Sequence, residues 1–215
     1  MELTLNELEK WFKDQESIIK DITITIKNLY RIIEPKDQFE KEILKHGFFN
    51  QFYQQCWFTA VVQLSKLFSD SKNHKRSFMK FFAVLKGNEL DSVLTVCFTQ
   101  NNNSFGKVFK SKQDMLDEIL IWESKIEQHK EIIEIICYLR DKTYAHRDSD
   151  YVQPQISVLD LEKLSFLAQG CYNAFRGGIL NKYFLFHINN DWSIDYPMRM
   201  LGLQLKANKS LKSVM

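Results

Sequence analysis

The sequence predicts an all-α fold with an additional C-terminal extension, and two observations support this fold class. First, the 215 residues include only 7 Gly and 3 Pro, too few for the regularly spaced turns of an all-β protein. Second, apolar residues recur at steps of three and four along several long segments, which is the spacing of one face of a helix. The chain is long enough for one domain with a full hydrophobic core.

The first helix is expected from Thr4 to about Ile33. Thr4 is followed three residues later by Glu7, which is the spacing of a capping box, and Pro35 ends the segment because proline interrupts helical hydrogen bonding. Residues 21–26 alternate isoleucine and threonine as a strand would. The charged, helix-favouring residues on both sides and the length of the segment nevertheless favour a helix.

A second helical segment is predicted over residues 37–69, where apolar residues recur on one face. These residues are Phe48, Phe49, Phe52, Cys56, Ala60, Val61, Leu64 and Leu67. A shorter amphipathic segment, residues 77–85, and a weaker one, residues 89–98, follow. The polar run at residues 101–104 predicts a loop.

Residues 111–147 carry the most regular helical pattern, with Ser111 as the expected N-cap. The residues of its apolar face, at alternating steps of four and three, are Met115, Ile119, Trp122, Ile126, His129, Ile133, Ile136 and Arg140. We interpret His129 as packed in a core or an interface. Arg140 occupies a position where an apolar residue is expected, so its guanidinium needs an anion or several acceptors, because an unpaired buried charge is costly.

The last predicted helix spans residues 157–175. Ser157 is its expected N-cap, with Asp160 three residues later. Gly177 and Gly178 are expected to end it, since glycine is common just after the last helical residue.

The sequence therefore divides into a helical domain, residues 1–178, and an extension, residues 179–215. The extension is rich in aromatic residues and ends in a basic, serine-containing tail. We expect this tail to fray, as chain ends commonly do.

Composition argues against several classes of protein. The net charge of +2 does not mark a nucleic-acid binder, although a local basic site remains compatible with it. The four cysteines are widely spaced and match no pattern of zinc ligands, so we expect free thiols in a reducing cytoplasm, with no metal and no cofactor. These cysteines are Cys56, Cys97, Cys137 and Cys171.

We expect a cytoplasmic protein with no membrane partner. Residues 1–13 lack the basic and apolar regions of a signal peptide. No run of residues approaches the roughly 18 uninterrupted apolar residues of a membrane-spanning helix.

Residues 139–148, Leu-Arg-Asp-Lys-Thr-Tyr-Ala-His-Arg-Asp, place His146 six positions after Arg140. This segment resembles the signature of the HEPN superfamily, in which an arginine, usually followed by a polar residue, precedes a histidine near the end of a long helix. Ala145 before the histidine and Asp148 after it are similar to the abortive-infection AbiU-like branch.

The resemblance extends upstream of this motif. Residues 57–70 are similar to an apolar helix of the same branch that ends in a Leu-Phe-acidic step. Together the two segments cover about residues 40–150. The aromatic-rich stretch after Gly178 shows no such similarity.

The resemblance implies a HEPN-like helical bundle that works as a homodimer and cleaves RNA without a metal. It implies a role in phage defence by abortive infection or in a toxin system, with an antitoxin or regulatory protein as a possible partner. His146 would deprotonate a ribose 2′-hydroxyl or protonate the leaving 5′-oxygen. Arg140 would hold the scissile phosphate and offset the charge that develops on its oxygens.

Four further residues of the motif are candidates for binding the substrate. Lys142 and Arg147 would contact phosphates, and Tyr144 would stack on a base. Asp141 stands where many members of the superfamily carry another polar residue, often asparagine, so it would either orient Arg140 or weaken anion binding.

Several other interpretations remain open. Arg140 and His146 lie about 120° apart on an ideal helix, so the length of the arginine, the end of the helix or a second subunit must close that gap. Arg140 would otherwise be structural, paired with Glu134 or with Asp141 of a partner, and His146 would be a solvated residue at a helix end. A silent HEPN module that binds nucleotide, RNA or protein is the main alternative function, and a structural dimerisation domain is the third.

Overall fold

The computed structural model of the protein describes residues 2–70, 76–90, 108–143, 155–188 and 193–212. Within these residues the protein is built from helices, apart from one parallel pair of two-residue strands, so the predicted all-α class is confirmed. The elements are β1 (Glu2–Leu3), α1 (Leu5–Ile33), α2 (Gln38–Leu44), α3 (Gly47–Phe68), α4 (Phe78–Gly87), β2 (Glu89–Leu90), α6 (Lys112–Glu127), α7 (Lys130–Thr143), α8 (Val158–Leu180), the 3₁₀ helix η1 (Phe186–Ile188) and α9 (Asp195–Lys212).

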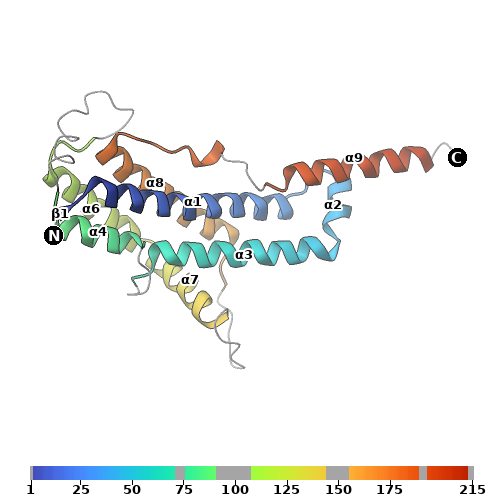
Figure 1. Ribbon diagram of the computed structural model, residues 1–215. Helices are drawn as coiled ribbons and strands as arrows, with labels where there is room; N and C mark the ends of the chain where they lie inside the picture. The colour runs from blue at the N-terminus through green and yellow to red at the C-terminus, as the bar shows by residue number, and fades with distance from the viewer. Residues whose placement is uncertain (1, 71–75, 91–107, 144–154, 189–192, 213–215) are drawn as a thin grey trace.

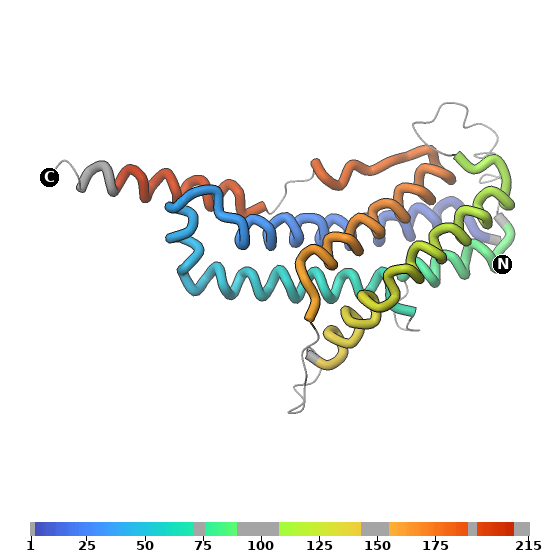
Figure 2. The backbone as a smooth tube through the Cα atoms, turned by 180° about the vertical axis from the view of Figure 1, so that it is seen from behind, coloured from blue at the N-terminus to red at the C-terminus, as the bar shows by residue number. Residues whose placement is uncertain are grey.

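The helices form an elongated bundle. α1 and α3 run side by side along the molecule and are joined by α2 at one end (Figure 1). α8 packs on α1, and α7 packs on α3. Both α7 and α8 lie on the face of the bundle that is turned towards the viewer in Figure 2. α9 extends past α2, so β1 and the end of α9 lie at opposite ends of the molecule.

The predicted helix starts at Thr4 and Ser157 are confirmed as capping boxes. The Thr4 hydroxyl accepts a hydrogen bond from the Glu7 backbone N–H at 3.3 Å, and the Glu7 carboxylate accepts one from the Thr4 N–H at 3.0 Å. Ser157 and Asp160 make the same reciprocal pair, with both bonds at 3.2 Å. Each box satisfies backbone donors that the first helical turn leaves without partners.

Residues 21–26 are helical, as predicted, despite their strand-like alternation. All of Ile22 to Ile26 are buried, so side chains on every side of this part of α1 pack inside the protein. The Thr23 hydroxyl donates to the Ile19 carbonyl at 2.8 Å, which satisfies a polar group that the core would otherwise isolate. The alternation of isoleucine and threonine therefore reflects burial of this part of α1 from several sides, and not an edge position in a sheet.

The segment predicted as one helix over residues 37–69 consists of two helices, α2 and α3. The interruption is at Lys45 and His46, whose backbone N–H groups bond to the carbonyls of Glu42 and Ile43 at 3.3 and 3.0 Å. The ring nitrogen Nδ1 of His46 accepts from the Phe48 N–H at 3.3 Å. A histidine thus acts as the N-cap of α3, a role for which serine, threonine, aspartate and asparagine are the usual residues.

An aromatic cluster forms the centre of the core. The fully buried Phe175 of α8 lies with its ring centroid 5.1 Å from that of Phe82 and 5.8 Å from that of Phe81, both on α4. Phe109, just before α6, lies 5.9 Å from the same ring. These edge-to-face and tilted contacts join three segments that are remote in the sequence, so they hold α4, α6 and α8 together.

The predicted end of the helix at Gly177 and Gly178 is wrong, because α8 continues to Leu180 and ends on Asn181 in a left-handed conformation (φ 52°). The two glycines have no positive φ. Their role is close packing: a Cβ at Gly177 would overlap the Tyr183 ring, and one at Gly178 would overlap the Phe109 ring. The backbone also makes contact here, since the Phe109 N–H donates to the Gly178 carbonyl at 2.9 Å.

Gly178→Ala is expected to lower the free energy of unfolding by about 1–3 kcal/mol, because the added methyl group displaces a fully buried ring. The better helix propensity of alanine, about 1 kcal/mol, offsets part of that loss. Gly202→Ala in α9 is the matched control, since nothing lies within 4 Å of its Cβ, and it is expected to be neutral or stabilising. Equal destabilisation of both variants in urea titrations would contradict the close-packing role.

The C-terminal extension differs from its prediction. Residues 195–212 form α9, which includes part of the basic tail that we expected to fray, and α8 runs two residues past the predicted boundary at residue 178. The division into two units stays a prediction. Among the described residues, no helix combines the length and apolar character needed to span a membrane.

Parts of the predicted pattern lie outside the described residues. The weak segment predicted over residues 89–98 begins with β2, and its remainder, Cys97 and the predicted loop at residues 101–104 are not among those described.

Candidate functional site

The helix that leads to the candidate site begins as predicted. The Ser111 hydroxyl accepts from the Asp114 N–H at 3.1 Å and caps α6. The apolar face is buried along both α6 and α7, as the stripe predicted. The buried residues of this face are Met115, Ile119, Trp122, Ile126, Ile133 and Ile136.

The predicted single helix over residues 111–147 is interrupted at Gln128 and His129, which form a turn between α6 and α7. In a continuous helix the His129 N–H would bond to the Lys125 carbonyl. Here the His129 ring nitrogen Nδ1 bonds to that carbonyl at 2.9 Å, and the His129 N–H bonds to the Ile126 carbonyl at 3.0 Å. His129 is half-buried at this turn, and the competition of its side chain for a backbone acceptor explains the break.

Arg140 lies in the last turn of α7, where the buried stripe ends. Only 18% of its side chain is exposed, while the neighbouring Leu139 is fully buried. Cys137, one turn earlier, is hydrogen-bonded to Ser69 at the end of α3, and burial raises the pKa of its thiol. This turn of α7 therefore packs against the C-terminal end of α3 and holds Arg140 at the surface of the bundle.

Asp141 is the hydrogen-bond partner of Arg140 that matters most for its charge. Nε of Arg140 donates to Oδ1 of Asp141 at 2.7 Å. This bond raises the pKa of Arg140. Burial lowers the same pKa, but by less than the bond raises it. The arginine is therefore cationic at any ordinary pH, and the carboxylate restricts the orientation of its planar guanidinium.

The structure brings only part of the predicted site together. Arg140 and Asp141 are paired, and Lys142 is exposed on the same turn. Tyr144, His146 and Arg147 lie outside the described residues. The separation of Arg140 from His146 therefore stays a prediction.

In the part of the chain that the structure describes, no three His, Cys, Asp or Glu side chains cluster in a way that could hold an ion.

Two partly buried polar clusters were not expected from the sequence. In the first, Glu16 of α1 accepts from Lys20, from the Tyr172 hydroxyl at 2.8 Å and from Arg176 at 2.6 Å. Burial opposes the ionisation of Glu16, but the hydrogen bonds of Lys20 and Tyr172 outweigh it and lower the pKa of Glu16. The pairing of Glu16 with Lys20 could have been predicted from their i to i+4 spacing in the sequence. Their partners on α8, Tyr172 and Arg176, are remote in the sequence and could not.

The second cluster joins α1, α2 and α9. Arg31 bonds through Nη2 to Glu40 and through Nε to Asp195 at 2.6 Å. Its third nitrogen, Nη1, is buried with no hydrogen-bond partner among the described residues. This arrangement attaches the start of α9 to the bundle.

Comparison with models of protein families, with curated proteins and with solved structures gave no match for this chain.

Proposed function

We propose that this protein is a HEPN-like, metal-independent endoribonuclease of the cytoplasm that acts in phage defence by abortive infection or in a toxin system. The position of Arg140 is the observation that supports this proposal most. The guanidinium of Arg140 lies at the end of the buried apolar stripe and carries a fixed positive charge. It is mostly shielded from solvent, and the neighbouring carboxylate of Asp141 orients it. A guanidinium held in this way is suited to a phosphate, because its planar donor fork matches phosphate oxygens.

In the proposed reaction the ribose 2′-hydroxyl attacks the adjacent phosphorus, and the bond to the 5′-oxygen of the next nucleotide breaks. His146 accepts the proton of the 2′-hydroxyl or, in its protonated form, gives one to the leaving 5′-oxygen. Arg140 offsets the charge on the phosphate oxygens. The products are a 2′,3′-cyclic phosphate and a free 5′-hydroxyl.

We propose further that two copies meet at the ends of their α7 helices, so that Arg140 of one copy works beside His146 of the other. The separation of about 120° between these positions on one helix motivates this arrangement. Lys142, Tyr144 and Arg147 would then contact the RNA near the shared site.

The Arg140–Asp141 ion pair also favours a second function, a silent module that binds nucleotide, RNA or protein. A carboxylate beside the guanidinium competes with a phosphate for the same donors. Asp141 is 62% exposed, however, so water screens much of that competition.

Cleavage of single-stranded RNA by the wild-type protein is expected to persist in EDTA, because the attacking group is a ribose hydroxyl and not a metal-bound water. Replacing the ribose at the cut position by 2′-deoxyribose is expected to abolish the cut, and the normal product should carry a 2′,3′-cyclic phosphate. Gel assays with end-group analysis, run beside light scattering, test both the chemistry and the dimer.

Three results would go against this proposal. Cleavage of the deoxyribose substrate would exclude the mechanism. A monomer at micromolar concentration would exclude the shared site. If no RNA is cut under any condition, the silent module becomes the better description.

A further inference from the structure

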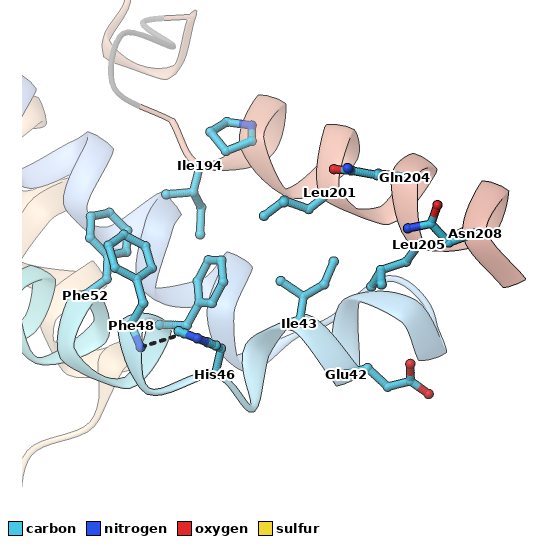
Figure 3. Close-up of a pocket in the computed structure, with 12 residues that line it drawn as sticks. Glu42, Ile43, His46, Phe48, Phe52, Ile194, Leu201, Gln204, Leu205 and Asn208 are labelled. Atoms are coloured by element: carbon cyan, nitrogen blue, oxygen red, sulfur yellow. Dashed lines mark hydrogen bonds between the residues drawn. The ribbon is translucent and has the colours of Figure 1, made fainter.

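An apolar groove lies between α9 and the corner where α2 meets α3 (Figure 3). Its volume is about 890 Å³. Ile43 and Phe48 line one wall, and Leu201 and Leu205 of α9 line the other. The groove is also lined by Phe49 and Ile194, which belong to a small hydrophobic core of their own.

The α9 wall is attached at several points along its length. The Ile194 N–H donates to the Asn28 side chain at 3.0 Å, and Asp195 accepts from Arg31 at 2.6 Å. Three turns later, Lys206 bonds to Asp37 at 2.9 Å. These contacts hold both walls in place, so the groove is a built feature of the fold.

The size of the groove indicates what it can hold. Binding sites for small molecules commonly have volumes of roughly 300–1,000 Å³ and mostly apolar linings. A helix of about three turns, roughly 16 Å long and 10 Å across, fills about 1,300 Å³. The groove is too small to enclose such a helix, and its volume is that of a small-molecule site.

The polar groups along the groove indicate the chemistry of the ligand. Gln204 and Asn208 of α9 line the groove, while Glu42 lies on the α2 side with its carboxylate pointing away from α9 (Figure 3). His46 accepts from the Phe48 N–H through Nδ1, which leaves Nε2 as the ring nitrogen that can donate. Among the described residues that line the groove there is no lysine or arginine, so the lining offers no cation to pair with an anion.

We propose that this groove binds a small apolar molecule that carries one uncharged hydrogen-bonding group, such as a hydroxyl or an amide. The apolar part lies against Phe48, Leu201 and the small core, and the polar group meets the amides of Gln204 and Asn208. The groove is separate from Arg140, so this inference goes beyond the proposed ribonuclease activity and does not depend on it.

Fluorescence titration with the neutral apolar dye N-phenyl-1-naphthylamine tests the proposal on the full-length protein. The dye is expected to bind, and 1-decanol is expected to displace it. Decanoate is expected to displace it more weakly, because no lysine or arginine lines the groove to pair with its carboxylate. Leu201→Trp fills the groove and is expected to weaken dye binding by about tenfold or more. Leu203→Trp is the matched control, because Leu203 is 55% exposed on the same helix but does not line the groove.

Ile43→Trp, on the opposite wall, is a second groove variant in case Leu201→Trp does not fold, and circular dichroism checks each protein. Weaker binding in the groove variants with unchanged binding in Leu203→Trp supports the proposal. Equal binding in Leu201→Trp and Leu203→Trp, equal displacement by decanoate and 1-decanol, or no dye binding by the wild-type protein overturns it. If Leu201→Trp halves the molar mass of the protein and no dye binds, a second copy occupies the groove. That result would also overturn the proposal.

Discussion

His146→Ala is expected to lower the rate of RNA cleavage by about 100-fold or more, the usual loss when a general acid or base is removed. The assay is single-turnover cleavage of single-stranded RNA in EDTA. His187→Ala is the matched control, because His187 is an exposed histidine of η1 that the mechanism does not use. Full activity of His146→Ala under metal-free conditions would show that another group moves the proton.

Arg140→Ala is expected to reduce cleavage to a similar extent, and its melting temperature separates a role in the reaction from a structural one. The ion pair with Asp141 is solvent-accessible on the carboxylate side, and such pairs contribute only about 0–1 kcal/mol to stability. The melting temperature should therefore change little while the rate falls. A large loss of stability with the rate unchanged would identify Arg140 as a structural residue.

Asp141→Asn refines the same test. The asparagine side chain keeps an oxygen that can accept from Arg140 but removes the negative charge. If Asp141 only orients the guanidinium, cleavage should stay near the wild-type rate. If it competes with phosphate, RNA should bind more tightly to the variant, so the two roles of Asp141 are distinguished by affinity.

Phe175→Ala is expected to lower the free energy of unfolding by about 3–5 kcal/mol, because it leaves a cavity among Phe81, Phe82 and Phe109. That loss is a large fraction of the total stability of a typical domain. Chemical denaturation measures it. The matched control is Phe166→Ala on the same helix, where 62% of the side chain is exposed and a change within about 0.5 kcal/mol is expected.

A similar cost for Phe175→Ala and Phe166→Ala would contradict the position of the core. It would mean that the face of α8 that carries Phe166 is covered by a partner in solution, or that the contacts of Phe175 contribute little.

The starts of three helices could be predicted from the sequence because their signals are local. Thr4, Ser111 and Ser157 each cap a backbone N–H three residues later, so short motifs contain both partners of the bond. The buried stripe could also be predicted from residue spacing, because its members lie within one turn of each other along the helix. The same spacing predicted that Arg140 lies at the end of the stripe, mostly shielded from solvent.

The interruptions at His46 and His129 could not be predicted in the same way. In both places an imidazole takes part in a hydrogen bond with a backbone group near the break. Histidine has no strong preference for such positions, and the apolar face continues across each break. Periodicity therefore predicted one helix in each case where the structure has two.

The sequence by itself determined the helical class, the capped starts of the helices and the buried faces, because these depend on residues within one or two turns of each other. Only the tertiary structure decided where α8 ends, because the glycine at position 178 leaves room for the ring of Phe109 and does not mark the end of the helix. Phe109 lies far away in the chain. The tertiary structure also decided that the C-terminal segment forms α9, whose start is held by Asn28 and Arg31 of α1. A helix of this length is only marginally stable alone in water, so contacts with remote residues, and not its own sequence, account for its place beside the groove.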